Sequence, residues 1–475
     1  MNLPRRDPAD SLWRADRRAL TIGLVLTITL IGFESLAIST VMPIVADELG
    51  GIELYGWVFS AFFLGSLIGI VVVGGAIDRG GLALPFAAGL GLFAFGLLAG
   101  GLAPTMLILV VARFVQGLGA GALQPIAYVA IGRSLPDTLR PRMFATLSTA
   151  WILPGVIGPA IAGAVGETIG WRFVFLGLLP LIAVAGALTL GALRDVAVPP
   201  GVDEARAAAA SRSRLPLAIA VAVGAGLLTV GLTSGQLLPT VALSVGGVVL
   251  GIVALRRLTP PGTLLARPIL PAAVLLRGIL TCAFFGVDAF VALTLVDWRG
   301  LSATEAGLAL TAATISWTAG SWTQARGAAR RPTYQFVRIG FAITTIGLAG
   351  MLLVLNPEVP WLFGVLTFGV AGLGMGLSYS PLALIVLRES TPETQGSATS
   401  SLSLTDSLGT AIGTGLTGAM VAASVRATGE SATGLAAGFA IAVAIGLGGL
   451  LLTARLKPRT ASNAALALSP ASPPS

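Results

Sequence analysis

The stretch LTIGLVLTITLIGFESLAISTVMPIVA, from Leu20 to Ala46, decides the class of fold. It is longer than the stretch of about 20 apolar residues that a helix needs to cross the hydrocarbon core of a bilayer. It lacks the small-residue cleavage site of a signal peptide, so we expect it to remain as a first membrane span. It also holds an acid, Glu34, whose carboxylate would cost about 2.5–3.5 kcal/mol at the bilayer centre. That cost needs a functional or structural reason.

The composition of the whole chain agrees with this interpretation. Of the 475 residues, 55% are apolar and 11% are charged, whereas soluble domains carry about 25% charged residues. The net charge of +8 does not indicate nucleic-acid binding, because the cations are scattered between apolar runs and form no basic face. With one cysteine, Cys282, and no histidine, we expect no metal or other cofactor, and proton chemistry must use carboxylates.

The apolar runs predict fourteen membrane spans in groups of six, two and six. We expect spans at 20–46, 55–77, 82–103, 105–133, 142–166, 172–193, 215–234, 238–255, 270–295, 304–324, 335–355, 359–387, 397–424 and 432–454. Two blocks of six suggest the internal repeats of secondary transporters. The predicted parts are an N-terminal segment 1–19, a first block 20–193, a linker 194–214, two extra spans 215–255, a second linker 256–269, a second block 270–454 and a disordered tail 455–475.

The arginines predict the orientation. If the N-terminus is cytoplasmic, the cytoplasmic loops and ends hold nearly all the arginines, and the opposite loops hold only Arg172, Arg299 and Arg426. Positive residues concentrate on the cytoplasmic side of membrane proteins. The chain is therefore expected to have both termini in the cytoplasm.

Three glycine-rich motifs suit tight turns and close helix packing. GGAIDRGG lies between the second and third spans, where Asp78 can pair with an arginine or a helix N-terminus and lock one side shut. LVVARFVQGLGAG lies in the fourth span, and PGVIGPAIAG, with a proline kink, lies in the fifth. The motif residues are Gly74, Asp78, Arg79, Gly81, Arg113, Gln116, Gly117, Gly155, Gly158, Pro159 and Gly163.

Together these motifs resemble the signature motifs of the major facilitator superfamily. Glu34, with Pro43 nine residues on, is similar to the first-span motif of its fourteen-span drug:proton antiporter subfamily (EmrB/QacA type), and the extra central spans fit that subfamily. A second-half copy of the loop motif, GSWTQARGAARR, keeps Gly320 and Arg326 but has Gln324 in place of the acid. The resemblance implies an all-α integral membrane protein with the major facilitator fold, two pseudo-symmetric six-helix bundles and two extra helices.

The charges deep in apolar runs are the candidate site. At 1.5 Å per residue, Glu34 lies about 20 Å from the inner end of its span and Arg113 about 12 Å from the outer end of its own. In a core of about 30 Å these depths agree, so we expect the two side chains to approach each other in one state. Asp406 is also deep, and Asp288 lies near the outer end of its span. The four are candidates for proton coupling.

Each candidate has a structural alternative. Glu34 and Arg113 could form a packing clip, Asp288 could reach interfacial water, and Asp406 could bond a serine or threonine on a neighbouring helix. Arg277 is expected to extend to the interface and has no predicted role in the site. Three tryptophans would either line a cavity or belong to the interfacial aromatic belt: Trp57, Trp317 and Trp322.

We predict a proton-coupled antiporter that exports amphipathic drugs, cations among them, by alternating access across the cytoplasmic membrane of a bacterium. The cargo would contact Glu34, Asp288, Asp406, Trp57 and Trp317. The proton gradient would drive it without a cofactor, and its partners would be lipid, protons and a small molecule, with the protein a monomer. An exporter of an endogenous metabolite, antibiotic, siderophore or lipid stays open as an alternative. A membrane-embedded enzyme or receptor is disfavoured by the lack of histidine, metal clusters and a soluble domain.

Overall fold

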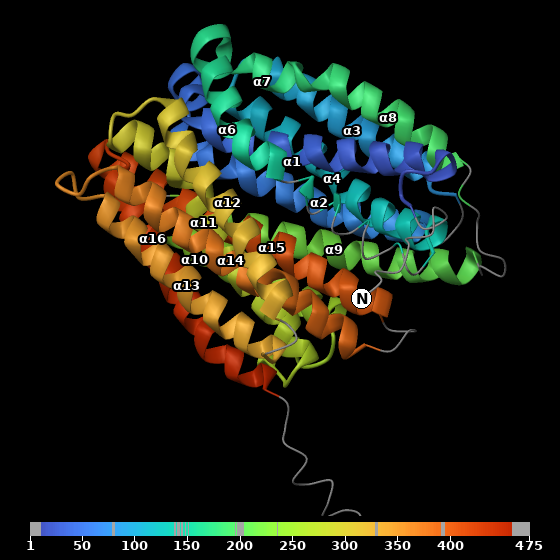
Figure 1. Cartoon of the computed structure of the whole chain (residues 1–475). Helices are drawn as coiled ribbons and strands as arrows, with labels where there is room; N and C mark the ends of the chain where they lie inside the picture. The colour runs from blue at the N-terminus through green and yellow to red at the C-terminus, as the bar shows by residue number, and fades with distance from the viewer. Residues whose placement is uncertain are drawn as a thin grey trace, which may run out of the picture.

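The computed structural model describes residues 11–77, 81–136, 139, 143, 146, 147, 149, 150, 152–194, 196, 204–234, 236–327, 331–390 and 395–457. Within these ranges every regular element is a helix, and most helices run side by side (Figure 1). The all-helical architecture follows from the length of the apolar runs, because a helix satisfies all of its backbone hydrogen bonds internally in lipid.

The helices come in three groups along the chain. The first group is α1 (Ala15–Leu49), η1 (Ile52–Leu54), α2 (Tyr55–Ile77), α3 (Ala83–Gly101), α4 (Met106–Ser134), α6 (Ile152–Val165), η2 (Gly166–Gly170), α7 (Arg172–Leu176) and α8 (Leu178–Arg194). The second is α9 (Glu204–Thr233), α10 (Leu237–Leu258) and η3 (Thr263–Leu265). The third is α11 (Leu270–Leu293), η4 (Thr294–Trp298), α12 (Ala303–Gly327), α13 (Thr333–Val354), α14 (Leu362–Arg388), α15 (Gln395–Thr428), α16 (Ala432–Leu452) and η5 (Thr453–Leu456).

Twelve helices in the described part of the chain are long and apolar enough to cross a membrane, so the protein is a multi-pass membrane protein. The prediction was fourteen spans, which this count does not support. In the predicted span 142–166, α6 has 14 residues, and the residues before it are described only in part. In the predicted span 304–324, α12 has 25 residues but carries threonines, serines and a glutamine that make it more polar than the twelve.

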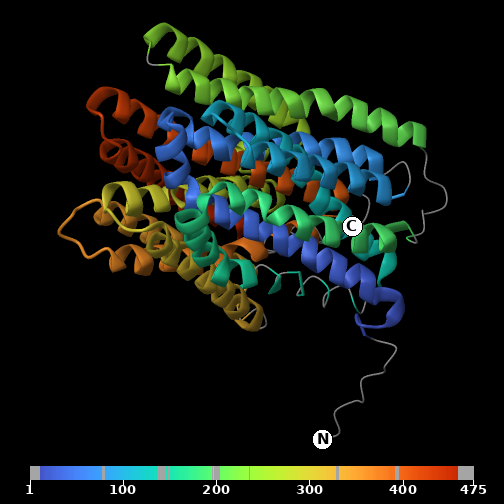
Figure 2. The same cartoon turned by 90° about the horizontal axis from the view of Figure 1, so that it is seen from above.

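The first and third groups lie on opposite sides of the molecule (Figure 1). The α9–α10 pair runs along one edge (Figure 2). We call the end of the bundle with residues 11–14 and Leu456 the terminus end, and the end with residues 50–54 the far end.

Two seams join the first and third groups. In one, α2 meets α15 so closely that a Cβ on Gly56 would lie 2.6 Å from the Cα of Gly418. One turn along α2, the Ser60 hydroxyl lies 2.9 Å from Thr414 Oγ1 and donates to the Ala411 carbonyl at 3.0 Å. Both contacts lie near the start of α2, so this seam is closed toward the far end.

In the other seam, α6 packs on α12. A Cβ on Gly163 would lie 2.8 Å from the Cα of Thr304, and a Cβ on Gly155 would overlap the Thr314 side chain. Beyond Gly163, Glu167 accepts hydrogen bonds from the backbone N–H and hydroxyl of Thr304, both at 3.1 Å. The small residues of the fifth-span motif therefore allow two helices of different groups to touch.

Helix α9 covers the α2–α15 seam from outside. Buried leucines of α2 and α15 pack with Val221 of α9 in one apolar cluster. Farther along, a Cβ on Gly415 would lie 2.7 Å from Thr229 Oγ1 and 3.2 Å from Ser60 Oγ. The extra helices thus contact both groups at the place where the groups meet.

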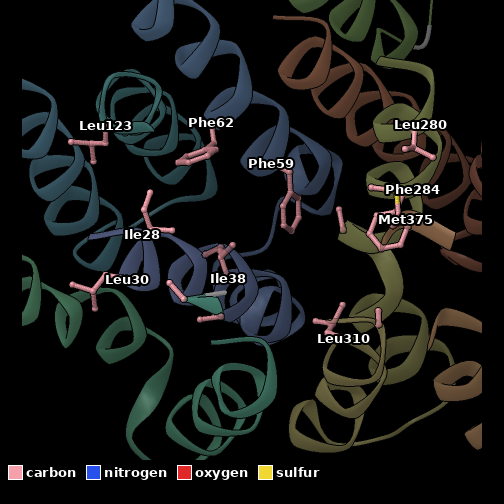
Figure 3. Packing of buried hydrophobic residues seen from close by; sticks show 14 of the residues in the cluster. Ile28, Leu30, Ile38, Phe59, Phe62, Leu123, Leu280, Phe284, Leu310 and Met375 are labelled. Carbon is pink, nitrogen blue, oxygen red and sulfur yellow. The ribbon is translucent and has the colours of Figure 1, made fainter. Parts of the chain in front are cut away.

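A continuous apolar core crosses the seams. Figure 3 shows Ile38, Phe59 and Phe62 on one side of the interface and Phe284 and Met375 on the other. Ring pairs connect the sides, with centroids 5.3 Å apart for Tyr55 and Phe290. Because lipid is as apolar as these side chains, packing and interhelical hydrogen bonds hold such helices together.

Candidate functional site

Close packing of α2 on α4 builds the first polar cluster. A Cβ on Gly117 would overlap the Phe62 carbonyl oxygen, and a Cβ on Gly65 would overlap that of Phe114. This close packing places the Arg113 side chain of α4 against α2. Its Nε donates to the Val58 carbonyl at 3.2 Å, and its guanidinium carbon lies 4.4 Å from the Phe62 ring centroid.

Arg113 pairs with Glu34 of α1, as the depths of the two residues in the sequence suggested. Its NH1 group donates to Glu34 Oε1 and, at 2.6 Å, to Gln116 Oε1. The side chains of Glu34 and Arg113 are each 3% exposed. Losing one member of a buried pair leaves an uncompensated charge, so each residue depends on the other. We call Glu34, Arg113 and Gln116 the Glu34 cluster.

The Glu34 cluster is incompletely bonded. Glu34 Oε2 and Gln116 Nε2 are buried without a hydrogen-bond partner among the described residues. A buried polar atom without a partner costs about 1–3 kcal/mol. A proton can therefore join Oε2 without breaking any hydrogen bond that Oε1 accepts, which makes this carboxylate able to change its charge in place.

A second polar cluster lies in the third group of helices. Arg277 Nε on α11 lies 3.3 Å from Asp406 Oδ1 on α15, and the Tyr379 hydroxyl on α14 donates to Asp406 Oδ2 at 2.9 Å. The guanidinium carbon of Arg277 lies 3.3 Å from the Tyr379 ring centroid, and its NH1 donates to the Tyr379 carbonyl at 2.5 Å. We call Arg277, Tyr379 and Asp406 the Asp406 cluster.

The Asp406 cluster corrects two expectations. Arg277 does not extend to the interface: it is 6% exposed and ion-paired. The carboxylate of Asp406 is ion-paired with Arg277 and accepts a hydrogen bond from Tyr379, not from the serine or threonine that the structural alternative proposes. Threonine still contributes, because the Thr281 hydroxyl donates to the Asp406 backbone carbonyl at 3.0 Å and helps to fix α15 against α11.

The two clusters differ in depth and in exposure. Arg113 is near the far end of α4, and Tyr128, within electrostatic reach of Arg277 and Asp406, lies about 22 Å farther along the same helix. The Asp406 side chain is 26% exposed and Tyr128 is 39% exposed. In this conformation the Glu34 cluster, toward the far end, is fully buried, and the Asp406 cluster, toward the terminus end, is partly exposed.

The remaining candidates lie around these clusters or apart from them. Trp317 packs edge-on against Phe284 and Tyr379, with ring centroids 5.7 and 5.2 Å apart, so it borders the Asp406 cluster. Asp288 is half-buried, two turns from Thr281 on the same side of α11, and has no hydrogen-bond or ion-pair partner among the described residues. Trp57 lies at neither cluster, because its ring contacts the Cβ position of Gly226 on α9 at 3.8 Å.

The structure describes the first loop motif only in part. Asp78 and Arg79 lie outside the described residues, between Gly74, near the end of α2, and Gly81. In the second copy, a Cβ on Gly320 would overlap the Leu373 carbonyl, so this glycine sets the distance between α12 and α14. Arg326 is exposed, and its guanidinium carbon lies 5.4 Å from the Trp322 ring centroid.

The sequence did not predict two sets of residues that the structure brings together. Arg277 and Tyr379 complete the Asp406 cluster, and Glu167 with Thr304 closes the α6–α12 seam. The available signal for Arg277 was a charge within an apolar run, and Glu167 follows the glycine motif of the fifth span directly. In the described residues no group of three or more Asp, Glu or Cys side chains could hold a metal ion.

Known proteins share the sequence pattern and the fold. The family profile described as Major Facilitator Superfamily matches residues 24–414. SdrM of Staphylococcus aureus, named a multidrug efflux pump, is 24% identical over 82% of this chain and 86% of its own. MdtP of Bacillus subtilis, named a multidrug transporter, is 25% identical over 83% and 74%.

Solved structures extend the comparison of folds. A bacterial homologue of the human lysosomal transporter Spinster, inward-facing and unoccupied, has a TM-score of 0.62 at 15% identity, covering 93% of this chain and 98% of its own. The xylose transporter XylE of E. coli, partially occluded and inward open, has a TM-score of 0.63 at 14% identity, covering 93% and 99%. At such identities the likeness concerns the fold alone.

Proposed function

Because the chain belongs to the major facilitator superfamily, we propose that it is a proton-coupled antiporter of the fourteen-span drug-exporting subfamily. It exports amphipathic compounds, cations among them, by alternating access across a bacterial cytoplasmic membrane. It works as a monomer and draws on the proton gradient without a cofactor. The family and its named efflux relatives support a transporter rather than an enzyme.

The span count and the orientation belong to the proposal. The packing of α6 on α12 supports two further spans, because it includes both helices in the seam between the groups. The distribution of arginines between the two ends of the bundle supports placing the terminus end in the cytoplasm. Arg172 pairs with Glu48, and Arg299 donates to carbonyls of residues 354–359, so both have local structural roles. The greater number of arginines at the terminus end then follows the positive-inside pattern.

One observation carries the coupling proposal: a dry Glu34–Arg113 ion pair with an unfilled carboxylate oxygen. Protonation at Oε2 would neutralise Glu34 and weaken its attraction to Arg113, which would loosen α1 from α4. The Glu34–Arg113 pair is buried away from bulk water in this conformation. Glu34 can therefore exchange a proton with the solvent only after the far end opens. A carboxylate that titrates only in one conformation links proton movement to the conformational change.

The Asp406 cluster and Asp288 are proposed to meet the cargo. The Asp406 side chain is partly exposed and lies beside the aromatic rings of Tyr379 and Trp317, which can stack on a flat cation. Asp288, without a counter-ion among the described residues, gives the interior a net negative charge when ionised. That charge favours cationic cargo over anionic cargo, which is the most specific statement about cargo that the site supports.

The test of coupling is the variant Glu34→Gln, which keeps the shape of the side chain and removes its titration. Cells that lack their own pumps and produce the variant should show no more efflux than uncoupler-treated cells that produce the unchanged protein. The matched control is Glu53→Gln, an exposed acid in η1, which should leave efflux intact. Uphill efflux by Glu34→Gln at normal protein levels would remove Glu34 from the coupling role.

The cargo is tested separately, by growth of the same cells against a panel of cationic, neutral and anionic amphipathic compounds, with and without uncoupler. Protection against cationic compounds should be lost in Asp288→Asn and retained in Glu53→Gln. Protection confined to anionic compounds would contradict the assignment of cargo charge while leaving the coupling test unaffected.

A further inference from the structure

The linker between α10 and α11 is a turn of defined shape. Gly262 has φ +90°, and two residues other than glycine, Ala266 and Ile269, also have positive φ, at 47° and 65°. Positive φ is uncommon for such residues and needs support from the surroundings. The Thr263 hydroxyl donates to the Pro260 carbonyl at 2.7 Å, and the Arg267 N–H donates to the Gly262 carbonyl at 3.1 Å. These bonds hold the turn in place.

The turn borders an open hollow whose lining includes two arginines. Its volume is about 310 Å³, and its lining includes Arg256, Thr263, Leu265 and Arg267. A second hollow next to it is lined by Val253, Arg256 and Arg257, so Arg256 borders both. We call these two neighbouring hollows, which share Arg256 at the terminus end of α10, the basic recess.

The charges of this basic recess are not neutralised within the described residues. The guanidinium groups of Arg256, Arg257 and Arg267 are exposed and have no hydrogen-bond or ion-pair partner there. The linker 256–269 contains no acid. A Cβ on Gly262 would lie 2.6 Å from Arg267 Cγ, so the missing side chain at this position lets Arg267 fold back over the turn.

An apolar face of α10 leads directly to the recess. Val245, Val249, Ile252 and Arg256 lie on one side of the helix, at positions i, i+4, i+7 and i+11. The three apolar side chains are 57%, 56% and 47% exposed. Leu265, which lines the recess itself, is 74% exposed. A hydrocarbon chain along this face would end at the arginines.

We propose that the basic recess binds the phosphate headgroup of an anionic phospholipid, whose acyl chains lie along the exposed face of α10. Three unpaired guanidinium groups offer donors in the geometry that phosphate oxygens accept. The turn fixes the backbone of Arg267 beside the last turn of α10, which carries Arg256 and Arg257, so the three residues are placed before the lipid arrives, which lowers the cost of binding. A soluble phosphate shares the headgroup chemistry but leaves the apolar face uncovered, so the lipid fits more of the surface.

The full-length protein in nanodiscs tests the site by retention of phosphatidylglycerol, counted by native mass spectrometry, against a background of phosphatidylcholine. The unchanged protein should retain phosphatidylglycerol in preference to phosphatidylcholine. Because each arginine near a membrane surface adds to the attraction for anionic lipid, Arg256→Gln with Arg267→Gln should weaken the preference about 30-fold. Gly262→Ala should weaken it too, because it displaces Arg267.

The matched control is Arg338→Gln, which removes an exposed arginine of α13 near the same end of the bundle. It should retain phosphatidylglycerol as the unchanged protein does. Equal losses in the double variant and in Arg338→Gln would overturn the site and leave a general surface attraction. Displacement of the lipid by millimolar inorganic phosphate would identify a soluble ligand and would also overturn the lipid assignment. Thermal unfolding in phosphatidylcholine alone confirms that each variant is folded.

Discussion

Arg277 and Asp406 form an ion pair that is neither dry nor fully solvated. Asp406 also accepts from Tyr379, whose ring lies against the guanidinium group, so charge, hydrogen bond and ring contact act on the same three residues. Removing the cation leaves a largely buried carboxylate without its counter-ion. This arrangement makes Arg277 a positioning residue for Asp406 and leads to a prediction about stability.

We expect Arg277→Ala to lower the free energy of unfolding by about 1–3 kcal/mol, below the value for a fully buried pair because Asp406 is partly exposed. The measurement is the thermal unfolding midpoint in detergent micelles. Adding Asp406→Asn should restore part of the loss, because no buried charge then lacks a partner. If the double variant is as unstable as the sum of both single variants, the two residues do not act as a pair.

The depth of each residue in its predicted span could predict the Glu34–Arg113 contact but not the Arg277–Asp406 contact. Glu34 and Arg113 sit far from their helix ends, so their depths alone suggested a contact, which the structure contains. Arg277 is the eighth residue of α11, where a long side chain can equally reach the interface or turn inward. The helix face decides between these outcomes, and the face depends on α14 and α15, which lie about a hundred residues later in the chain.

At the scale of elements, glycines decide how closely α2 and α4 approach. Gly65 and Gly69 of α2 meet Gly117 and Gly121 of α4, and a Cβ at any of the four would overlap a carbonyl oxygen of the facing helix. The sequence identified Gly117 as part of a motif but not its partner, since many membrane glycines only permit packing. The surroundings of Trp57 could not be predicted from the sequence, because its contact with α9 depends on where the two extra helices pack.

We expect Gly117→Ala to push α2 away from α4 and to destabilise the protein by about 1–3 kcal/mol, as overpacking does. It should also disturb the Glu34 cluster, because Arg113 is held against α2. The control is Gly91→Ala in α3, where a Cβ meets nothing within 4 Å and where alanine should be neutral or slightly stabilising. Equal unfolding midpoints for both variants would contradict the close-packing role of Gly117.

At the scale of the whole molecule, the two seams and the two clusters fit together. The α2–α15 contacts lie at the far end, on the side of the buried Glu34 cluster, and the partly exposed Asp406 cluster lies toward the other end. The sequence predicted two repeated blocks because six apolar runs precede the first polar linker and six follow the second. It could not predict which end is closed, since that depends on contacts such as Ser60 with Thr414, whose residues are far apart in the chain.

If transport requires the far end to open, a covalent link across the α2–α15 seam should stop it. Ser60→Cys with Thr414→Cys, in a Cys282→Ser background, places two thiols where the hydroxyl oxygens lie 2.9 Å apart. Oxidation should abolish efflux, and reduction should restore it, because the link joins helices that must separate. Thr27→Cys with Thr189→Cys is the control, since these hydroxyl oxygens lie 3.4 Å apart within the first group and their link should be tolerated. Undiminished efflux by a fully oxidised Ser60–Thr414 pair would show that α2 and α15 move as one body.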